Sequence, residues 1–269
     1  MVAIKKPVGV ITRGTTNPNR LRRVDRYISN LPILKNSLEP LVVDLGFGAY
    51  PRTAIELLDR TLEVNPKTKV LGIEIDPERI SKARPFANEK LYFQLGGFEV
   101  PIPKELNRDN VTLIRAMNVL RQYDESEVIA SWSLMQSRLE PEGLIIEGTC
   151  DEIGRLATWI TLDKTKPLSL TFSFRLLGLQ TPSKIAERLP KILIHHNIQG
   201  EPINTFLNQL DAAWANNAGL SVFSPIQRFT ACVEELVKAG WPIANTPKRW
   251  RLGELTIDWE AIKPLGVQL

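Results

Sequence analysis

The stretch Leu41-Val42-Val43-Asp44-Leu45-Gly46-Phe47-Gly48 decides the fold that this sequence predicts. Its apolar run is typical of a buried strand, because parallel strands covered on both faces are continuously apolar. The strand ends in a carboxylate and two glycines separated by one residue, after which residues 51–62 read as a helix. Glycine lets a loop take positive φ or approach a ligand closely. We therefore expect a ligand-approach loop at the sheet end where open α/β folds bind small molecules.

Four further apolar segments, at residues 69–76, 91–95, 111–115 and 144–150, alternate with helices or crossovers. This alternation predicts a doubly wound, mostly parallel sheet. Residues 157–162 and 168–174, joined by a Lys-Thr-Lys-Pro turn, predict an antiparallel pair at one edge. The expected fold class is therefore α/β and Rossmann-like, with an antiparallel edge pair and helical C-terminal additions.

Three regions describe the predicted organisation, which we expect to form one compact unit. Residues 1–40 form a basic, helical N-terminal segment or lid, residues 41–175 the core, and residues 176–269 additions on the acceptor side. The additions are expected to contain helices at 183–189, 204–216 and 225–239, a strand or buried segment at 191–196, and an exposed edge strand at 254–259. No full helix is expected in the linker 100–110.

Composition limits the function classes. With 269 residues and 43% hydrophobic content, the chain can bury a sizeable core. Cys150 and Cys232 are too far apart for a metal pair and too few for a disulfide framework, so we expect no metal site and a reducing compartment. The sequence has no apolar run of roughly 20 residues, and Lys5, Lys6 and Pro7 fall where a signal peptide would be apolar, which predicts a cytoplasmic protein. The net charge of +4 permits an anionic partner such as RNA without requiring one.

The N-terminal segment has two interpretations. Asn17 before Pro18 predicts a helix start, and Leu21, Val24 and Ile28 then share one face. Arginines fall largely off that face, at Arg20, Arg22, Arg23 and Arg26. The segment is either a solvated amphipathic helix over the sheet or an anion-binding lid, with loop 14–19 closing over substrate.

Two further strand ends carry candidate nucleoside contacts. Glu74 ends the second strand, where a carboxylate can accept both hydrogen bonds of a ribose diol. Asp76, two residues later, is expected only to cap the next helix. Gly97 and Phe98 follow the third strand at the place expected for an adenine ring, although Phe98 fits a core role equally well.

These segments resemble the class I S-adenosylmethionine-dependent methyltransferases. The resemblance rests on Asp44-Leu45-Gly46-Phe47-Gly48, on residues 72–78, and on the pattern of strand four and residues 141–144, and it covers roughly residues 40–150. It implies S-adenosyl-L-methionine as the cofactor. Carried over residue by residue, it places Asp44, Gly46 and Gly48 on the methionine side, Glu74 on the ribose, and Gly97 with Phe98 on adenine.

The order of residues separates this pattern from a nicotinamide enzyme. A dehydrogenase presents Gly-x-Gly-x-x-Gly to a pyrophosphate at a helix N-terminus, whereas here Asp44 precedes the glycines and would repel it. The chain also departs from the methyltransferase pattern, because Tyr50 replaces the frequent third glycine. No Asp or Asn follows the third strand to contact the adenine amine.

Methyl transfer from a sulfonium needs mainly alignment of the nucleophile, with or without removal of a proton. The candidate catalytic residues are Asn118, Asp151 and His195, and the candidate substrate-binding residues are Arg20, Arg23, Arg121 and Tyr123. The Asn-Pro-Pro-Tyr signature of amine methylation is absent. A small-molecule acceptor is favoured, and RNA or a protein side chain stays open.

Tryptophans crowd the C-terminal quarter, at Trp214, Trp241, Trp250 and Trp259, with Lys248-Arg249-Trp250-Arg251 among them. They form either a stacking wall for an aromatic or anionic acceptor, or the packing of the additions against the sheet. The alternative function is a non-catalytic, methyltransferase-like protein that binds RNA or a protein partner through its basic segments.

Overall fold

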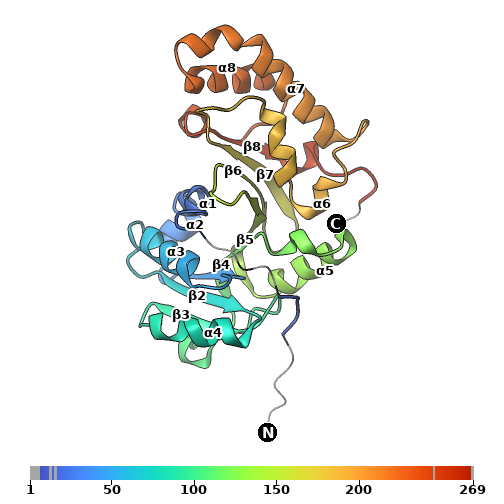
Figure 1. Cartoon of the computed structure of the whole chain (residues 1–269). Helices are drawn as coiled ribbons and strands as arrows, with labels where there is room; N and C mark the ends of the chain where they lie inside the picture. Colours follow the sequence, from blue (N-terminus) through green and yellow to red (C-terminus); the bar gives the residue numbers. More distant parts are fainter. Residues whose placement is uncertain (1–6, 12–13, 15–16, 245, 268–269) are drawn as a thin grey trace.

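The computed structural model describes residues 7–11, 14, 17–244 and 246–267, which form an eight-stranded sheet (Figure 1). The strands are β1 (Leu41–Leu45), β2 (Lys69–Glu74), β3 (Leu91–Leu95), β4 (Val111–Met117), β5 (Leu139–Cys150), β6 (Leu156–Leu162), β7 (Pro167–Phe174) and β8 (Glu254–Asp258). Their order is β3-β2-β1-β4-β5-β6-β7-β8. Strands β1 to β5 pair in parallel, and β6, β7 and β8 add antiparallel pairings.

Strand β1 lies at the centre of the parallel part, between β2 and β4. All five of its residues are buried, as expected for an apolar strand covered on both faces. From β1 the chain first builds outward to β2 and β3, and then crosses back to place β4 on the other side of β1. The order therefore reverses between β1 and β4, and the crevice at the carboxyl ends of these strands is where such sheets bind ligands.

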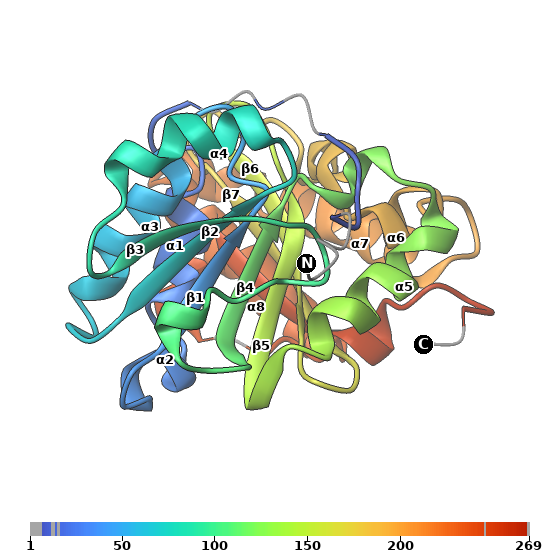
Figure 2. The same cartoon turned by 90° about the horizontal axis from the view of Figure 1, so that it is seen from below.

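Helices cover both faces of the sheet (Figure 2). They are α1 (Arg22–Ile28), α2 (Pro32–Asn36), α3 (Arg52–Leu62), α4 (Pro77–Ala83), α5 (Glu125–Gln136), α6 (Lys191–Ile194), α7 (Pro202–Asn216), α8 (Pro225–Lys238) and α9 (Pro247–Trp250), with short 3-10 turns η1 (Arg84–Phe86), η2 (Lys104–Leu106), η3 (Leu120–Gln122), η4 (Pro182–Arg188), η5 (Ala218–Val222) and η6 (Trp259–Ala261). Apolar side chains of α1, α2 and α3 form one core with the sheet, those of α5, α7 and α8 form a second, and those of α4 form a small third cluster with Phe47. None of the helices in the described ranges has the length and apolar character needed to cross a bilayer.

The α/β fold class predicted from the sequence is confirmed. The predicted antiparallel pair is present as β6 and β7, but β8 pairs beyond β7 and forms the outer edge. The first four residues of β8 are buried, so the prediction of an exposed edge strand is wrong in that respect. Arg23 of α1 donates to the carbonyl of Leu252, and α9 packs beside the strand, which covers this edge.

One local prediction is wrong, and another is wrong in one of its two alternatives. Helix α1 begins at Arg22, because Asn17 does not cap it: the Asn17 side-chain amide donates to the carbonyl of Glu152 at 2.8 Å. The Leu21, Val24 and Ile28 face is buried as expected. Residues 191–194 form the short helix α6, which follows Pro190, so the strand alternative for 191–196 is wrong. Ile192 and Leu193 are buried, as the other alternative, a buried segment, predicted. The predicted lid loop 14–19 includes Thr15 and Thr16, which lie outside the described residues.

Candidate functional site

The loop after β1 has the backbone geometry that its glycines were expected to provide. Gly46 and Gly48 have φ of +73° and +88°, a region that side chains with a Cβ rarely adopt. A Cβ on Gly46 would lie 2.8 Å from a methyl group of Val119. The Gly46 amide donates to the carbonyl of Ile73 at 2.8 Å, and the Gly48 amide donates to Glu74 Oε2 at 2.9 Å. The loop is therefore tied to the end of β2.

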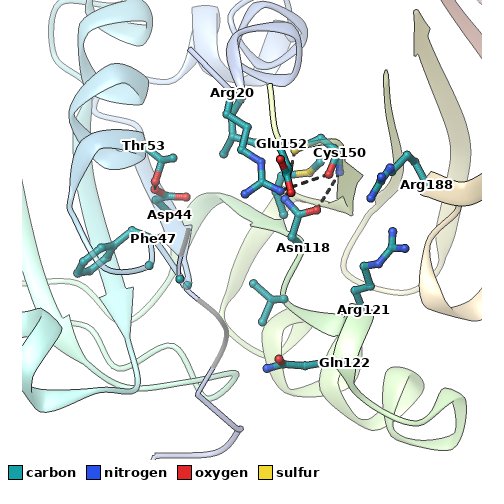
Figure 3. A pocket seen from close by; sticks show the side chains of 16 residues that line it. Arg20, Asp44, Phe47, Thr53, Asn118, Arg121, Gln122, Cys150, Glu152 and Arg188 are labelled. Atoms are coloured by element: carbon teal, nitrogen blue, oxygen red, sulfur yellow. Dashed lines mark hydrogen bonds between the residues drawn. The ribbon is translucent and has the colours of Figure 1, made fainter. Parts of the chain in front are cut away.

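A cavity of about 450 Å³ opens at the carboxyl ends of β1 and β4, at the switch point of the sheet (Figure 3). Its walls come from the glycine loop, the segments that follow β4 and β5, the start of α1 and the end of η4. The lining residues are Gly14, Arg20, Leu21, Asp44, Gly46, Phe47, Gly48, Thr53, Met117, Asn118, Val119, Arg121, Gln122, Cys150, Glu152 and Arg188. This set includes six of the residues predicted to bind or act in the site.

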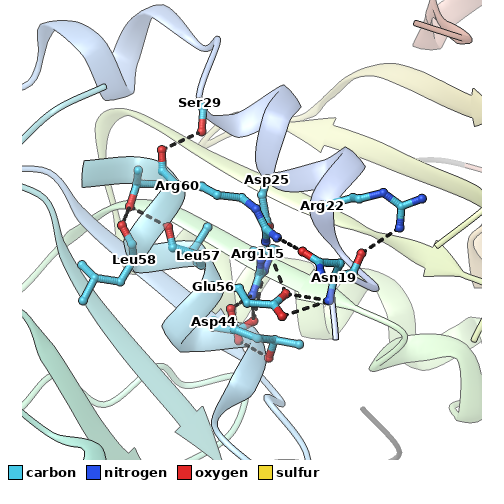
Figure 4. Close-up of polar contacts among 12 residues, drawn as sticks. Asn19, Arg22, Asp25, Ser29, Asp44, Glu56, Leu57, Leu58, Arg60 and Arg115 are labelled. Atoms are coloured by element: carbon cyan, nitrogen blue, oxygen red, sulfur yellow. Dashed lines mark hydrogen bonds and ion pairs between the residues drawn. The ribbon is translucent and has the colours of Figure 1, made fainter. Parts of the chain in front are cut away.

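Asp44 lines the cavity, but its carboxylate is already bound by the protein. Thr53 Oγ1 donates to Asp44 Oδ2 at 2.6 Å, and Arg115 Nη2 lies 2.8 Å from Oδ1. Arg115 is fully buried in β4, also pairs with Asp25 of α1, and donates to the carbonyl of Thr53 (Figure 4). Burial disfavours the Arg115 cation, but the two carboxylates outweigh it and raise its pKa. The negative charge of Asp44 is thus neutralised from within the fold.

Glu74 is buried at the end of β2, as a ribose-binding carboxylate would be. Its Oε2 accepts from the Gly48 amide and its Oε1 from the amide of Ile75 at 2.9 Å. Arg79 Nη1 lies 3.5 Å from Oε2. Each carboxylate oxygen can accept more than one hydrogen bond, so these contacts fix the orientation of Glu74 without saturating it.

Residues Val8–Val10, which we call the N-terminal strap, fill the region predicted to hold adenine. The amide of Phe98 donates to the Val8 carbonyl at 3.0 Å, and the Val8 amide donates to Glu99 Oε2 at 2.9 Å. A Cβ on Gly97 would lie 1.9 Å from the Val8 carbonyl oxygen. A space of only about 20 Å³ remains beside Glu74, Gly97 and Phe98, enough for about one water.

Tyr123 holds the other end of the strap. Its hydroxyl accepts the Val10 amide, and the Gln122 side-chain amide donates to the Val10 carbonyl at 3.3 Å. The Tyr123 ring is buried against Phe98, with ring centroids 5.3 Å apart. Tyr123, a predicted substrate-binding residue, and Phe98, a predicted adenine contact, therefore lie together, and both contact the strap in this structure.

Of the three predicted catalytic residues, only Asn118 lines the cavity. It follows β4 with a φ of +62°, its Oδ1 accepts the Cys150 amide at 2.9 Å, and its Nδ2 lies 3.2 Å from Cys150 Sγ. Burial raises the pKa of the Cys150 thiol, so this side chain stays uncharged near neutrality. Asn118 is therefore held rigidly at the cavity wall.

Asp151 and His195 occupy other positions. The Asp151 carboxylate accepts from the backbone amides of Ile153, Arg155 and Leu156, which shapes the turn between β5 and β6. His195 is exposed at the end of α6 and does not line this cavity.

The predicted substrate-binding arginines lie in two different places. Arg20 and Arg121 line the cavity, and Arg20 donates to the Asp151 carbonyl at 2.9 Å. Arg23 instead donates to the carbonyl of Gly154, in the turn between β5 and β6, and to the carbonyl of Leu252, just before β8, each at 3.2 Å. Burial, reinforced by neighbouring arginines, lowers the pKa of Arg23 to about 10. The structure therefore gives Arg23 contacts that join α1 to the C-terminal region.

Sequence reasoning missed Arg115 and Arg188. A charged residue inside the apolar segment Val111-Thr112-Leu113-Ile114-Arg115-Ala116-Met117 was a usable signal, because a buried arginine requires buried carboxylates. Arg188 had no such signal, since it reaches the cavity from η4 only through the tertiary fold.

The tryptophans of the C-terminal quarter serve mainly in packing. Trp214, Trp250 and Trp259 are buried, and the indole of Trp241 donates to Gln209 at 2.6 Å. In the described part of the chain, no cluster of three or more His, Cys, Asp or Glu side chains is arranged to hold a metal ion.

Comparisons with known proteins add to this description. No protein-family model and no curated protein matches the chain. Human N-acetylserotonin methyltransferase, solved with SAM, is 22% identical, covers 50% of this chain and 36% of that chain, and gives a TM-score of 0.36. The CcbJ methyltransferase of Streptomyces caelestis is 19% identical, with 58% and 66% covered and a TM-score of 0.38. Magnesium protoporphyrin IX methyltransferase from Synechocystis PCC 6803, with bound SAH, is 16% identical, with 49% and 56% covered and a TM-score of 0.36.

Each match therefore covers between about half and three fifths of this chain, and less than two thirds of the solved chain. At these identities the comparisons concern the fold alone. The strand order and the parallel pairing of β1 to β5 establish that fold independently. The chain has the Rossmann-like α/β fold predicted from its sequence, and the solved structures named above are methyltransferases.

Proposed function

We propose that the protein is an S-adenosylmethionine-dependent methyltransferase with a small-molecule acceptor. The observation that carries the proposal is the position of the cavity. It adjoins the Gly46–Gly48 loop, and the buried carboxylate of Glu74 stands at the neighbouring strand end. A volume of about 450 Å³ falls within the range of small-molecule sites, roughly 300–1,000 Å³.

The residues present fit two parts of the cofactor, its methionine end and its ribose. The glycine loop and the cavity beside it would hold the methionine end, and Glu74 would accept the ribose hydroxyls. Adenine could lie beside Gly97 only if the strap moved away, because the Val8 carbonyl now lies against this glycine. When bound, the cofactor supplies an electrophilic methyl group.

The chain's own contribution to methyl transfer would be alignment. Asn118 is fixed by Cys150 at the cavity wall and is the residue we assign to orienting the acceptor. Asp151 and His195, the other predicted catalytic residues, would act only indirectly, because neither lines the cavity. Leu21 and Phe47 make part of the cavity wall apolar, which would limit the access of water to the reacting atoms.

The test is calorimetric titration of the purified protein with S-adenosylmethionine and with S-adenosylhomocysteine. Glu74→Gln should weaken either affinity by about tenfold or more, since hydrogen bonds to a charged group contribute about 1.5–3 kcal/mol. Glu78→Gln is the matched control, because Glu78 is a surface carboxylate of α4 that contacts Lys82. Failure of both ligands to bind to folded protein, with and without the strap, would refute the proposal.

The competing proposal is a non-catalytic, methyltransferase-like protein that binds RNA or a protein partner. One observation favours it: the strap fills the adenine region. The same titration separates the two proposals, because a scaffold that has lost the cofactor would not gain affinity for it when the strap is removed.

A further inference from the structure

Two arginines from separate parts of the chain meet at the cavity wall. Arg121 belongs to η3, directly after β4, and Arg188 ends η4. Both line the same cavity, and Figure 3 shows their guanidinium groups directed toward each other on the side away from Asp44. Because these residues are far apart in the sequence, only the tertiary fold creates the pair.

Buried contacts fix the backbone of Arg188, and a side-chain contact joins Arg121 to the same segment. The side chains of Thr149 on β5 and Thr158 on β6, both fully buried, donate to the carbonyl of Arg188. Arg121 Nη1 donates to the carbonyl of Glu187 at 2.9 Å. The end of η4 is therefore attached both to the sheet and to Arg121, which holds the two cations at one place.

The positive charge at this place is not neutralised by the protein. Within the described residues, neither guanidinium forms an ion pair with a carboxylate. Burial lowers the pKa of Arg121, and repulsion from Arg188 lowers it further, against a smaller opposing effect of Glu187. The other charged side chains that line the cavity are Arg20, Glu152 and Asp44, and Asp44 is already paired with Arg115.

We propose that the acceptor carries an anionic group, a carboxylate or a phosphate, that Arg121 and Arg188 bind together. This inference rests on the proposed function, because it names the acceptor class of the same cavity. The planar guanidinium offers paired donors that match the oxygens of these anions, and charge-assisted pairs are the stronger hydrogen bonds. An anion between the two cations would also relieve their repulsion.

The experiment is titration of the full chain with inorganic phosphate and, separately, with acetate, each with and without saturating S-adenosylhomocysteine. Arg121→Gln and Arg188→Gln are compared with the wild type, after circular dichroism and thermal melting have shown that each variant is folded. Arg84→Gln is the matched control, because Arg84 is exposed in η1 and does not line the cavity.

We expect phosphate or acetate to bind to the wild type and to Arg84→Gln, and the affinity to fall about tenfold or more in each cavity variant. The anion that binds more tightly identifies the chemistry. The pair should still bind it in the presence of S-adenosylhomocysteine, because the site is assigned to the acceptor.

Three results would overturn the inference: no binding of either anion, equal binding by all variants, or displacement of the anion by S-adenosylhomocysteine. The last result would assign the arginines to the carboxylate of the cofactor. If the anion binds through both arginines but S-adenosylhomocysteine does not bind at all, the anion site stands and the proposed methyltransferase function fails.

Discussion

Removal of the N-terminal strap should raise the affinity of the protein for the cofactor. The strap occupies the space that adenine would need, with the Val8 carbonyl against Gly97. The strap and the adenosine group therefore compete for one place. A variant that begins after residue 11 presents the adenine region without this competitor.

The size of the effect follows from the contacts of the strap. Four hydrogen bonds join it to Phe98, Glu99, Tyr123 and Gln122. At about 0.5–1.5 kcal/mol each, they contribute roughly 2–6 kcal/mol, against a similar cost for ordering a few residues. Val8 and Val10 are 44% and 60% exposed, so apolar burial adds little. The net free energy that holds the strap in place is therefore at most about 3 kcal/mol, which limits the affinity gain to roughly 150-fold.

Calorimetry with S-adenosylhomocysteine measures this gain directly. Tyr123→Phe, which removes the hydroxyl that accepts the Val10 amide, should give a smaller gain of about fivefold. Tyr92→Phe is the control, since the Tyr92 hydroxyl donates to the Glu89 carbonyl away from the strap. Unchanged or weaker binding by the truncated protein would refute the reasoning, because the strap would then be part of the cofactor site.

Three further predictions concern stability. Burial raises the pKa of Glu147 to about 8, so the native state binds this proton more tightly than the unfolded chain, and stability should fall as pH rises from about 4.5 to 8. Glu147→Gln should remove up to about 5 kcal/mol of this pH-dependent loss, as measured by urea unfolding of both proteins at pH 5 and 8.5. An equal change in the free energy of unfolding between these pH values in wild type and variant would contradict the prediction. Burial disfavours the His196 cation, but its two carboxylate partners outweigh this and raise its pKa. Its contribution is thus present below pH 6.5 and lost as pH rises through the raised value. His196→Ala should therefore cost up to about 1 kcal/mol at pH 6 and less at pH 9, and an equal cost at both pH values would argue against the ion pairs. Asp25→Ala leaves Arg115 buried with one partner fewer and should cost about 3–5 kcal/mol, whereas Asp59→Ala, on the exposed face of α3, should cost little, and similar melting curves for the two would count against the buried network.

The parallel core could be predicted from the sequence because each strand is a local property. Residues 41–45 and 91–95 are apolar runs bounded by polar or glycine residues, and β1 and β3 have these bounds. Asp76 accepts from the Glu78 amide at 2.8 Å as a helix cap, which also depends only on neighbouring residues. The burial of β8 could not be predicted in this way, because part of its cover comes from α1, which is distant in the chain.

The site was predictable only where one strand end carried the residues. Gly46, Gly48 and Glu74 follow directly from their strands, and the structure brings them together. Arg188 and the strap reach the site from η4 and from the N-terminus, so no local pattern indicated them. Asp151 and His195 were candidates by residue type alone. The Asp151 carboxylate instead accepts hydrogen bonds within a turn, and His195 is exposed on the surface.

The structure also changes the reason for excluding a dinucleotide. The sequence argument relied on repulsion between Asp44 and a pyrophosphate, but Arg115 neutralises that carboxylate. The loop amides give a stronger reason. The Gly46 amide donates to the Ile73 carbonyl, and the Gly48 amide donates to Glu74, so neither is available to a phosphate. The Glu74 carboxylate thus stands where a phosphate oxygen would otherwise bind, and the same carboxylate suits a ribose diol. Under the proposed function, a preference for a nucleoside over a pyrophosphate would therefore reside in the contact between the loop after β1 and the end of β2, not in the charge of Asp44.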